Sequence, residues 1–114
     1  MSEAKRPISV LIVAGLYLAV GAVGFIAHFP GQTNIHRDDV LVEITELVAF
    51  TAGIFLLRRQ NWARWLALSW ILFHVGISYF DGIRPVLIHC LMSALIAWAL
   101  FHAAANRYFG NAPQ

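Results

Sequence analysis

Two glutamates lie one helical turn apart in a stretch of sequence that is otherwise apolar. Glu43 and Glu46 belong to the run VLVEITELVAFTAGIFLL. A carboxylate costs several kcal/mol in lipid, so a chain that crosses a membrane retains one there for a partner or for a task. Two neighbouring carboxylates do not readily both ionise at low dielectric. A shared proton, a histidinium or a metal ion would relieve their repulsion.

Histidines lie in the other apolar stretches, and counting places two of them at the depth of the glutamates. At about 1.5 Å per helical residue, Glu46 and His74 each lie roughly 9 Å from the outer end of their segments. Glu43 and His89 lie roughly 5–6 Å in, and His28 stands near the end of the first stretch. The pattern predicts a cluster of acidic and histidine side chains in the outer half of a membrane.

The composition identifies lipid as the surrounding solvent. The chain has 114 residues, of which 60% are hydrophobic and 12% are charged, whereas a soluble domain carries about 25% charged residues. Each apolar segment approaches the roughly 20 residues that a helix needs to cross a bilayer. We expect an all-α integral membrane protein with one domain over residues 1–114, an up-and-down bundle of four transmembrane helices at about 8–29, 40–57, 63–80 and 85–105.

The basic residues predict how this bundle is oriented. Four crossings place both termini and the loop around residues 58–64 on one side of the membrane. Six basic residues fall on that side and two on the other, which predicts cytoplasmic termini and a multi-pass protein of the bacterial inner membrane. The sequence contains no basic tract of the kind that binds nucleic acid, so nucleic acid is not an expected partner. The six are Lys5, Arg6, Arg58, Arg59, Arg64 and Arg107, and the two are Arg37 and Arg84.

One hypothesis for the polar cluster is that it binds a quinone or moves protons. Quinone carbonyls accept hydrogen bonds from histidine or from a protonated carboxyl, and quinone rings pack against aromatic walls. Histidine also exchanges protons near neutral pH. The residues expected to form this ligand-binding or proton-transfer site are Glu43, Glu46, His74, His89, Trp70 and Tyr79.

A second hypothesis is a mononuclear metal site formed by Glu46, His74 and His89, because two histidines and a carboxylate suit Zn, Fe or Mn. The di-iron pattern of carboxylate-rich bundles does not apply, since it needs Glu-x-x-His and this chain contains none. Haem held by His74 and His89 is a further alternative. The single cysteine, Cys90, excludes an internal disulfide and any Cys-x-x-Cys motif.

The structural alternative is that these polar residues only hold helices together. Either glutamate, paired with a histidine or an arginine of another segment, would determine how two helices meet. Tyr17, Gly21 and Gly24 share one face of the first segment with His28, and the glycines there would let a second backbone approach closely. The sequence predicts the cluster under both interpretations.

The second and third segments carry a family resemblance. The stretch EITELVAFTAGIFLLRRQNWARWLAL has an acidic residue early in one helix, small residues, a glycine and then a basic turn. In this respect, and in its four-helix layout, the chain resembles the DoxX-like class of small bacterial membrane proteins. That resemblance implies membrane-associated redox work, quinone-linked in some members and often beside other subunits. Glu46 or Glu43 corresponds to the acidic position.

These observations lead to a functional expectation with two alternatives. We expect a small inner-membrane subunit with a redox or quinone-associated role, in which the Glu/His cluster binds a ligand or moves protons. The alternatives are a non-catalytic accessory subunit that packs against a larger membrane complex, and a metal-binding or metal-transporting membrane protein. The expected partners are the lipid bilayer and either further copies of the chain or a larger complex. Nothing in the sequence names a reaction.

Overall fold

A computed structural model describes residues 6–27 and 37–110 of the chain. Within these ranges the protein contains helices and connecting turns and no strand, which confirms the prediction of an all-α protein. The elements are α1 (Ile8–Ala27), α2 (Arg37–Leu57), α3 (Asn61–Ser78), the 3₁₀ turn η1 (Tyr79–Asp81), α4 (Ile83–Phe101) and α5 (Ala103–Gly110).

Three of these helices are long and apolar enough to cross a membrane. They are α1, the part of α2 from Val40 to Leu57, and α4. Most of their large apolar side chains face outward, with Ile8 and Ile26 each 75% exposed, and a surface of this kind requires lipid around it. α3 is less apolar than these three, because it carries Arg64, His74 and three tryptophans.

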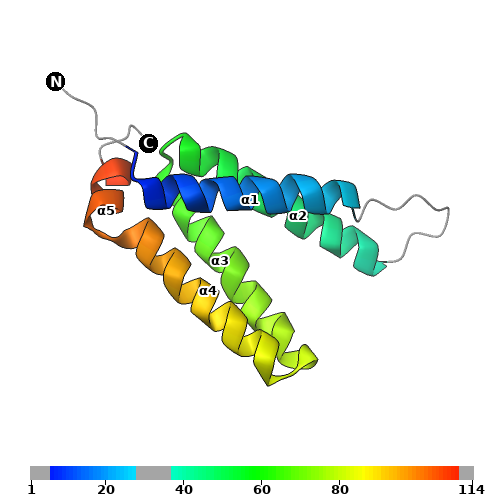
Figure 1. Cartoon of the computed structure of the whole chain (residues 1–114). Coiled ribbons are helices and arrows are strands. Elements are labelled where there is room, and N and C mark those ends of the chain that lie inside the picture. Colours follow the sequence, from blue (N-terminus) through cyan, green and yellow to red (C-terminus); the bar gives the residue numbers. More distant parts are fainter. Residues whose placement is uncertain (1–5, 28–36, 111–114) are drawn as a thin grey trace.

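The helices form two antiparallel pairs that diverge from a common base. α1 packs along α2, and α3 packs along α4 (Figure 1). The pairs meet near α5 and separate toward their far ends, so the molecule is an open wedge measuring 56 × 32 × 19 Å. Small residues allow the close contact at the base, where Ala63 and Ala67 of α3 are fully buried. Trp70, Phe73 and His74 follow on α3 and stand between the pairs.

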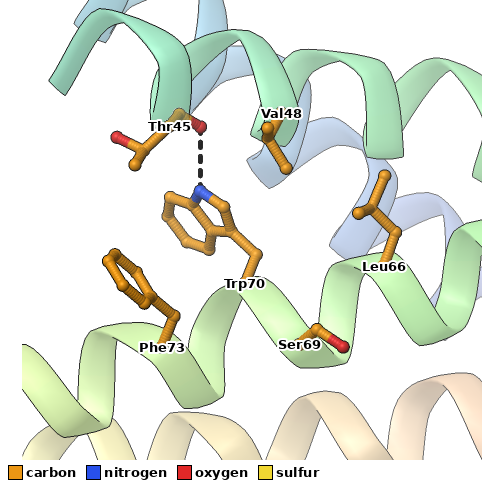
Figure 2. A pocket seen from close by; sticks show the side chains of 6 residues that line it. All are labelled: Thr45, Val48, Leu66, Ser69, Trp70 and Phe73. Carbon is orange, nitrogen blue, oxygen red and sulfur yellow. Dashed lines mark hydrogen bonds between the residues drawn. The ribbon is translucent and has the colours of Figure 1, made fainter. Parts of the chain in front are cut away.

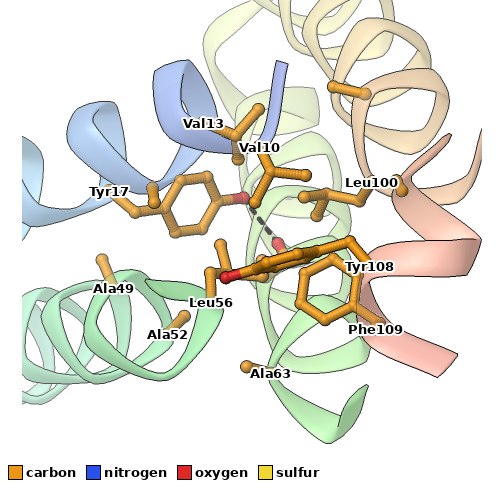
Figure 3. Packing of buried hydrophobic residues seen from close by; sticks show 14 residues of the cluster. Val10, Val13, Tyr17, Ala49, Ala52, Leu56, Ala63, Leu100, Tyr108 and Phe109 are labelled. Carbon is orange, nitrogen blue, oxygen red and sulfur yellow. Dashed lines mark hydrogen bonds between the residues drawn. The ribbon is translucent and has the colours of Figure 1, made fainter. Parts of the chain in front are cut away.

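The buried core lies at the base of the wedge. There the hydroxyl of Tyr17 donates a 2.6 Å hydrogen bond to the carbonyl oxygen of Ala67, which ties α1 to α3 (Figure 3). α5 lies across this end and inserts Tyr108 and Phe109, which are 1% and 0% exposed. Around them pack Val10, Val13, Ala49, Ala52, Leu56, Ala63 and Leu100.

The last apolar segment is not one continuous helix from 85 to 105, as the sequence had predicted. α4 begins at Ile83, ends at Phe101, and the chain turns at His102 with an extended backbone (φ −73°, ψ 173°). The His102 ring stacks on Trp98 at 4.8 Å, and its Nε2 lies 2.8 Å from the hydroxyl of Ser9. The turn allows α5 to fold beneath the bundle, where Tyr108 and Phe109 are buried.

Glycines determine how closely α1 approaches α2. A Cβ on Gly21 would lie 2.6 Å from the backbone nitrogen of Phe50 and 2.7 Å from the carbonyl oxygen of Glu46. A Cβ on Gly24 would overlap the Glu46 carboxylate, and one on Gly53 would lie 2.8 Å from Leu18 Cγ. The glycine face that the sequence indicated on the first segment therefore contacts the glutamate-bearing helix.

We predict that Gly21→Ala destabilises the protein, because the new methyl group meets the α2 backbone, which cannot rotate away. Overpacking of this kind costs about 1–3 kcal/mol. The measurement is the thermal unfolding midpoint in detergent. Gly15→Ala on the same helix is the matched control, since nothing lies within 4 Å of its Cβ position. Equal midpoints for the two variants would contradict this packing.

Candidate functional site

His74 and His89 come together between α3 and α4. Their ring centroids are 6.4 Å apart and their planes are inclined by 21°. Each Nδ1 lies 2.8 Å from a carbonyl oxygen of its own helix, that of Trp70 for His74 and that of Pro85 for His89. A carbonyl cannot donate, so both Nδ1 atoms carry the hydrogen. In the neutral ring, Nε2 then remains as a hydrogen-bond acceptor.

Trp70 connects this pair of histidines to the other two long helices. Its ring centroid lies 4.0 Å from that of His74, with the planes tilted by 37°, and 5.3 Å from that of Tyr17 on α1. Its indole Nε1 donates a 2.9 Å hydrogen bond to the carbonyl oxygen of Thr45 on α2 (Figure 2). The indole is thereby held in one orientation at the point where the two helix pairs begin to separate.

An apolar pocket lies beside the histidines, enclosed by α1, α3 and α4. We call it the histidine pocket; it has a volume of about 160 Å³, and its walls include Tyr17, Trp70, His74, His89 and Met92. Nearly all of the wall is apolar, apart from the histidines and the tyrosine, so each polar atom there has a large effect on which ligand fits.

A second, more open cleft lies between α2 and α3. It has a volume of about 430 Å³ and is lined by Glu46, His74, Thr45 and Phe73 among others. His74 borders both cavities, whereas Glu46 borders only this cleft and His89 only the histidine pocket. The structure therefore brings Glu46, His74, His89 and Trp70 into one region, arranged as a chain with His74 in the middle.

The two glutamates occupy different environments although both are only 9% exposed. The carboxylate of Glu46 lies against Gly24 of α1 and faces the cleft. Both carboxyl oxygens of Glu43 are buried, and neither forms a hydrogen bond with any residue of the described ranges. A buried polar group without a hydrogen-bond partner costs stability. The adjacent pair expected from the sequence thus consists of one cleft residue and one residue outside the two cavities.

Tyr79 lies outside this group. It belongs to η1, is 75% exposed, and its ring contacts the edge of Phe80 at 5.8 Å. The 3₁₀ turn ends the helical periodicity at Ser78, so the ring does not continue the face that carries His74. His28 and His36 fall in the segment that the structure does not describe.

The three proposed metal ligands do not gather around one point. No group of three or more His, Cys, Asp or Glu side chains among residues 6–27 and 37–110 is arranged to hold a metal ion. Glu46 and His89 border separate cavities, and Trp70 and His74 stand between them. The described residues therefore do not form the predicted site of Glu46, His74 and His89.

Several residues of the site were not singled out from the sequence. Tyr17 forms part of the pocket wall and its ring contacts Trp70, and its position four residues before Gly21 was the available signal. Met92 follows His89 at i+3 and lines the same pocket, as the helical period requires. Thr45 borders the cleft and provides the backbone carbonyl that holds Trp70, and the sequence carries no signal for such a carbonyl.

Comparison of the chain with protein families, curated proteins and solved structures finds no match. The resemblance to the DoxX-like class therefore rests on the residues quoted above alone. The function has to be argued from the geometry of the site.

We predict that Glu43→Met raises the stability of the protein. Methionine is unbranched like glutamate and removes a buried carboxyl that lacks a described partner, a defect that costs about 1–3 kcal/mol. The thermal midpoint in detergent should rise. A lower midpoint would show that the Glu43 carboxyl stabilises the fold through a partner. Thr45→Val on the same helix is a control for adding apolar character at a half-buried site.

Proposed function

We propose that all four long helices cross the bacterial inner membrane and that both termini are cytoplasmic. The support comes from the ends of the helices. Arg6, before α1, donates a 3.0 Å hydrogen bond to Leu57 O at the end of α2, and Ser9 of α1 donates one to Ala99 O near the end of α4. α2 and α4 thus end at one level. α3 joins the end of α2 to the start of α4, so a crossing by both α2 and α4 requires α3 to cross as well.

This topology predicts the accessibility of engineered cysteines. In a Cys90→Ser background, a membrane-impermeant maleimide added to intact spheroplasts should label Asp81→Cys, because η1 lies on the outer side. It should label Arg107→Cys only after the membrane is opened. Both positions are exposed in the structure, so burial does not explain a difference. Labelling of Arg107→Cys in intact cells would contradict the orientation.

We further propose that the protein is a small quinone-associated membrane subunit, and that the histidine pocket holds the ring of a quinol. The observation that carries this proposal is the pair of Nε2 acceptors in an apolar pocket with an aromatic wall. Quinol hydroxyls donate hydrogen bonds, which suits neutral Nε2. Quinone carbonyls only accept, so the oxidised form would need a protonated histidine.

The position of His74 supports proton movement away from such a ligand. A hydrogen bond from a quinol hydroxyl to Nε2 of His74 is the geometry from which that nitrogen could accept a proton. The same ring borders the cleft that contains Glu46, so the next acidic group lies across a shared cavity.

We predict that the detergent-solubilised protein binds a short-chain quinol more tightly than the matching quinone at pH 8. His89→Ala should weaken quinol binding about tenfold, the loss expected for one hydrogen bond of about 1.4 kcal/mol. An anaerobic titration monitored by tryptophan fluorescence measures both affinities. Cys90→Ala is the matched control, because Cys90 is adjacent in sequence but exposed.

Two outcomes would contradict this function. Equal affinity for both redox forms in wild type and His89→Ala would show that the pocket does not recognise the ligand through histidine. Stable co-purification with a larger membrane complex, together with no binding of either form, would favour the accessory-subunit alternative. Glu46→Gln separates a proton role from a packing role. It should leave quinol affinity unchanged and lower the rate of quinol oxidation by the assembled complex.

A further inference from the structure

Two arginines converge on one tyrosine at the base of the bundle. The guanidinium carbons of Arg6 and Arg59 lie 5.9 and 5.1 Å from the ring centroid of Tyr108. Arg6 donates through Nε to the Tyr108 hydroxyl at 3.0 Å and through Nη2 to Leu57 O at 3.0 Å. Arg59 donates through Nε to Tyr108 O at 3.2 Å. Three separate parts of the chain thereby meet at one small cationic site.

The positive charge of this site is not balanced within the described residues. No salt bridge involves either arginine there. The carboxylates with described side chains lie away from the site, with Glu43 and Asp81 toward the opposite ends of the helices and Glu46 at the middle of α2. Each guanidinium has five N–H donors, and these contacts use two on Arg6 and one on Arg59. The remaining donors are available to an anion.

The site lies where lipid headgroups must be. Arg6 comes two residues before the first membrane-spanning helix, and Arg59 comes two residues after Leu57, where the second apolar stretch ends. Headgroup phosphates occupy this level of a bilayer. The planar guanidinium fork matches phosphate oxygens in geometry and charge.

The backbone at Arg59 provides independent support. Arg59 has φ of 60° and forms the turn that ends α2, with Gln60 N donating to Phe55 O at 3.0 Å. This left-handed position strongly favours glycine, because a Cβ is strained there. An arginine at such a position implies that its side chain performs a task that offsets the strain.

We propose that Arg6 and Arg59 bind the phosphate of one anionic phospholipid against the ring of Tyr108. The lipid would bridge the start of α1, the α2–α3 turn and α5, and would therefore hold α5 against the base of the bundle. This site is independent of the histidine pocket, which lies farther along the wedge.

The test is the thermal midpoint of the purified chain in neutral detergent, titrated with phosphatidylglycerol, phosphatidylcholine or inorganic phosphate. Phosphatidylglycerol should raise the midpoint of the wild type in a saturable way, and the other two should not. Arg59→Gly should unfold at the same or a higher temperature without lipid, because glycine relieves the backbone strain. Its apparent affinity for phosphatidylglycerol should fall about tenfold, as expected for the loss of a charge-assisted hydrogen bond.

Arg107→Gln is the matched control, since it removes an equal charge from an exposed position on α5 and should retain the lipid response. Arg59→Asn, which also tolerates left-handed backbone, replaces the glycine variant if that variant does not fold. Three results would overturn the proposal. The first is an unchanged lipid response in the Arg59 variants. The second is an equal loss of phosphatidylglycerol affinity in Arg107→Gln, and the third is stabilisation of the wild type by inorganic phosphate alone.

Discussion

The hydrogen bond from the Tyr17 hydroxyl to the carbonyl of Ala67 joins the two helix pairs near the base of the wedge. The bond is buried, and fully buried alanines at positions 63 and 67 let the helices come near enough to form it. Beyond this point the residues of α3 that stand between the pairs are large, namely Trp70 and His74, and the pairs separate. The histidine pocket and the cleft both follow from this change in side-chain size along α3.

The molecule has two chemically different ends. At the base, arginine side chains pack on aromatic rings. The guanidinium carbon of Arg64 lies 4.6 Å from the ring centroid of Phe101 and 5.2 Å from that of Phe109. Farther along, the polar groups are the histidine pair and the glutamates. A cationic base suits lipid headgroups, and a histidine pocket with apolar walls suits a ring-shaped ligand. Trp70 lies between these regions and holds its orientation through the carbonyl of Thr45.

Periodicity and depth counting predicted a large part of this arrangement. His74 and His89 face one another because residues at similar distances from a shared turn lie at nearby levels of two antiparallel helices. The glycine face of α1 contacts α2, as its spacing indicated. Such reasoning could not predict that Tyr79 and Glu43 lie outside the two cavities. One depends on a 3₁₀ turn that ends the helical period, and the other depends on which face of α2 the first helix covers.

The sequence by itself determined that the chain is helical and suited to lipid, because apolar length and composition are local properties. It predicted four crossings, and three of the helices have the length and apolar character of a membrane span. It also determined which residue types were available for chemistry. Only the tertiary structure decided that α5 folds under the bundle at His102 and that Glu46, His74 and His89 border two linked cavities instead of one metal site. These features depend on the crossing angle of the helix pairs, which arises from side-chain volumes that meet across distant segments.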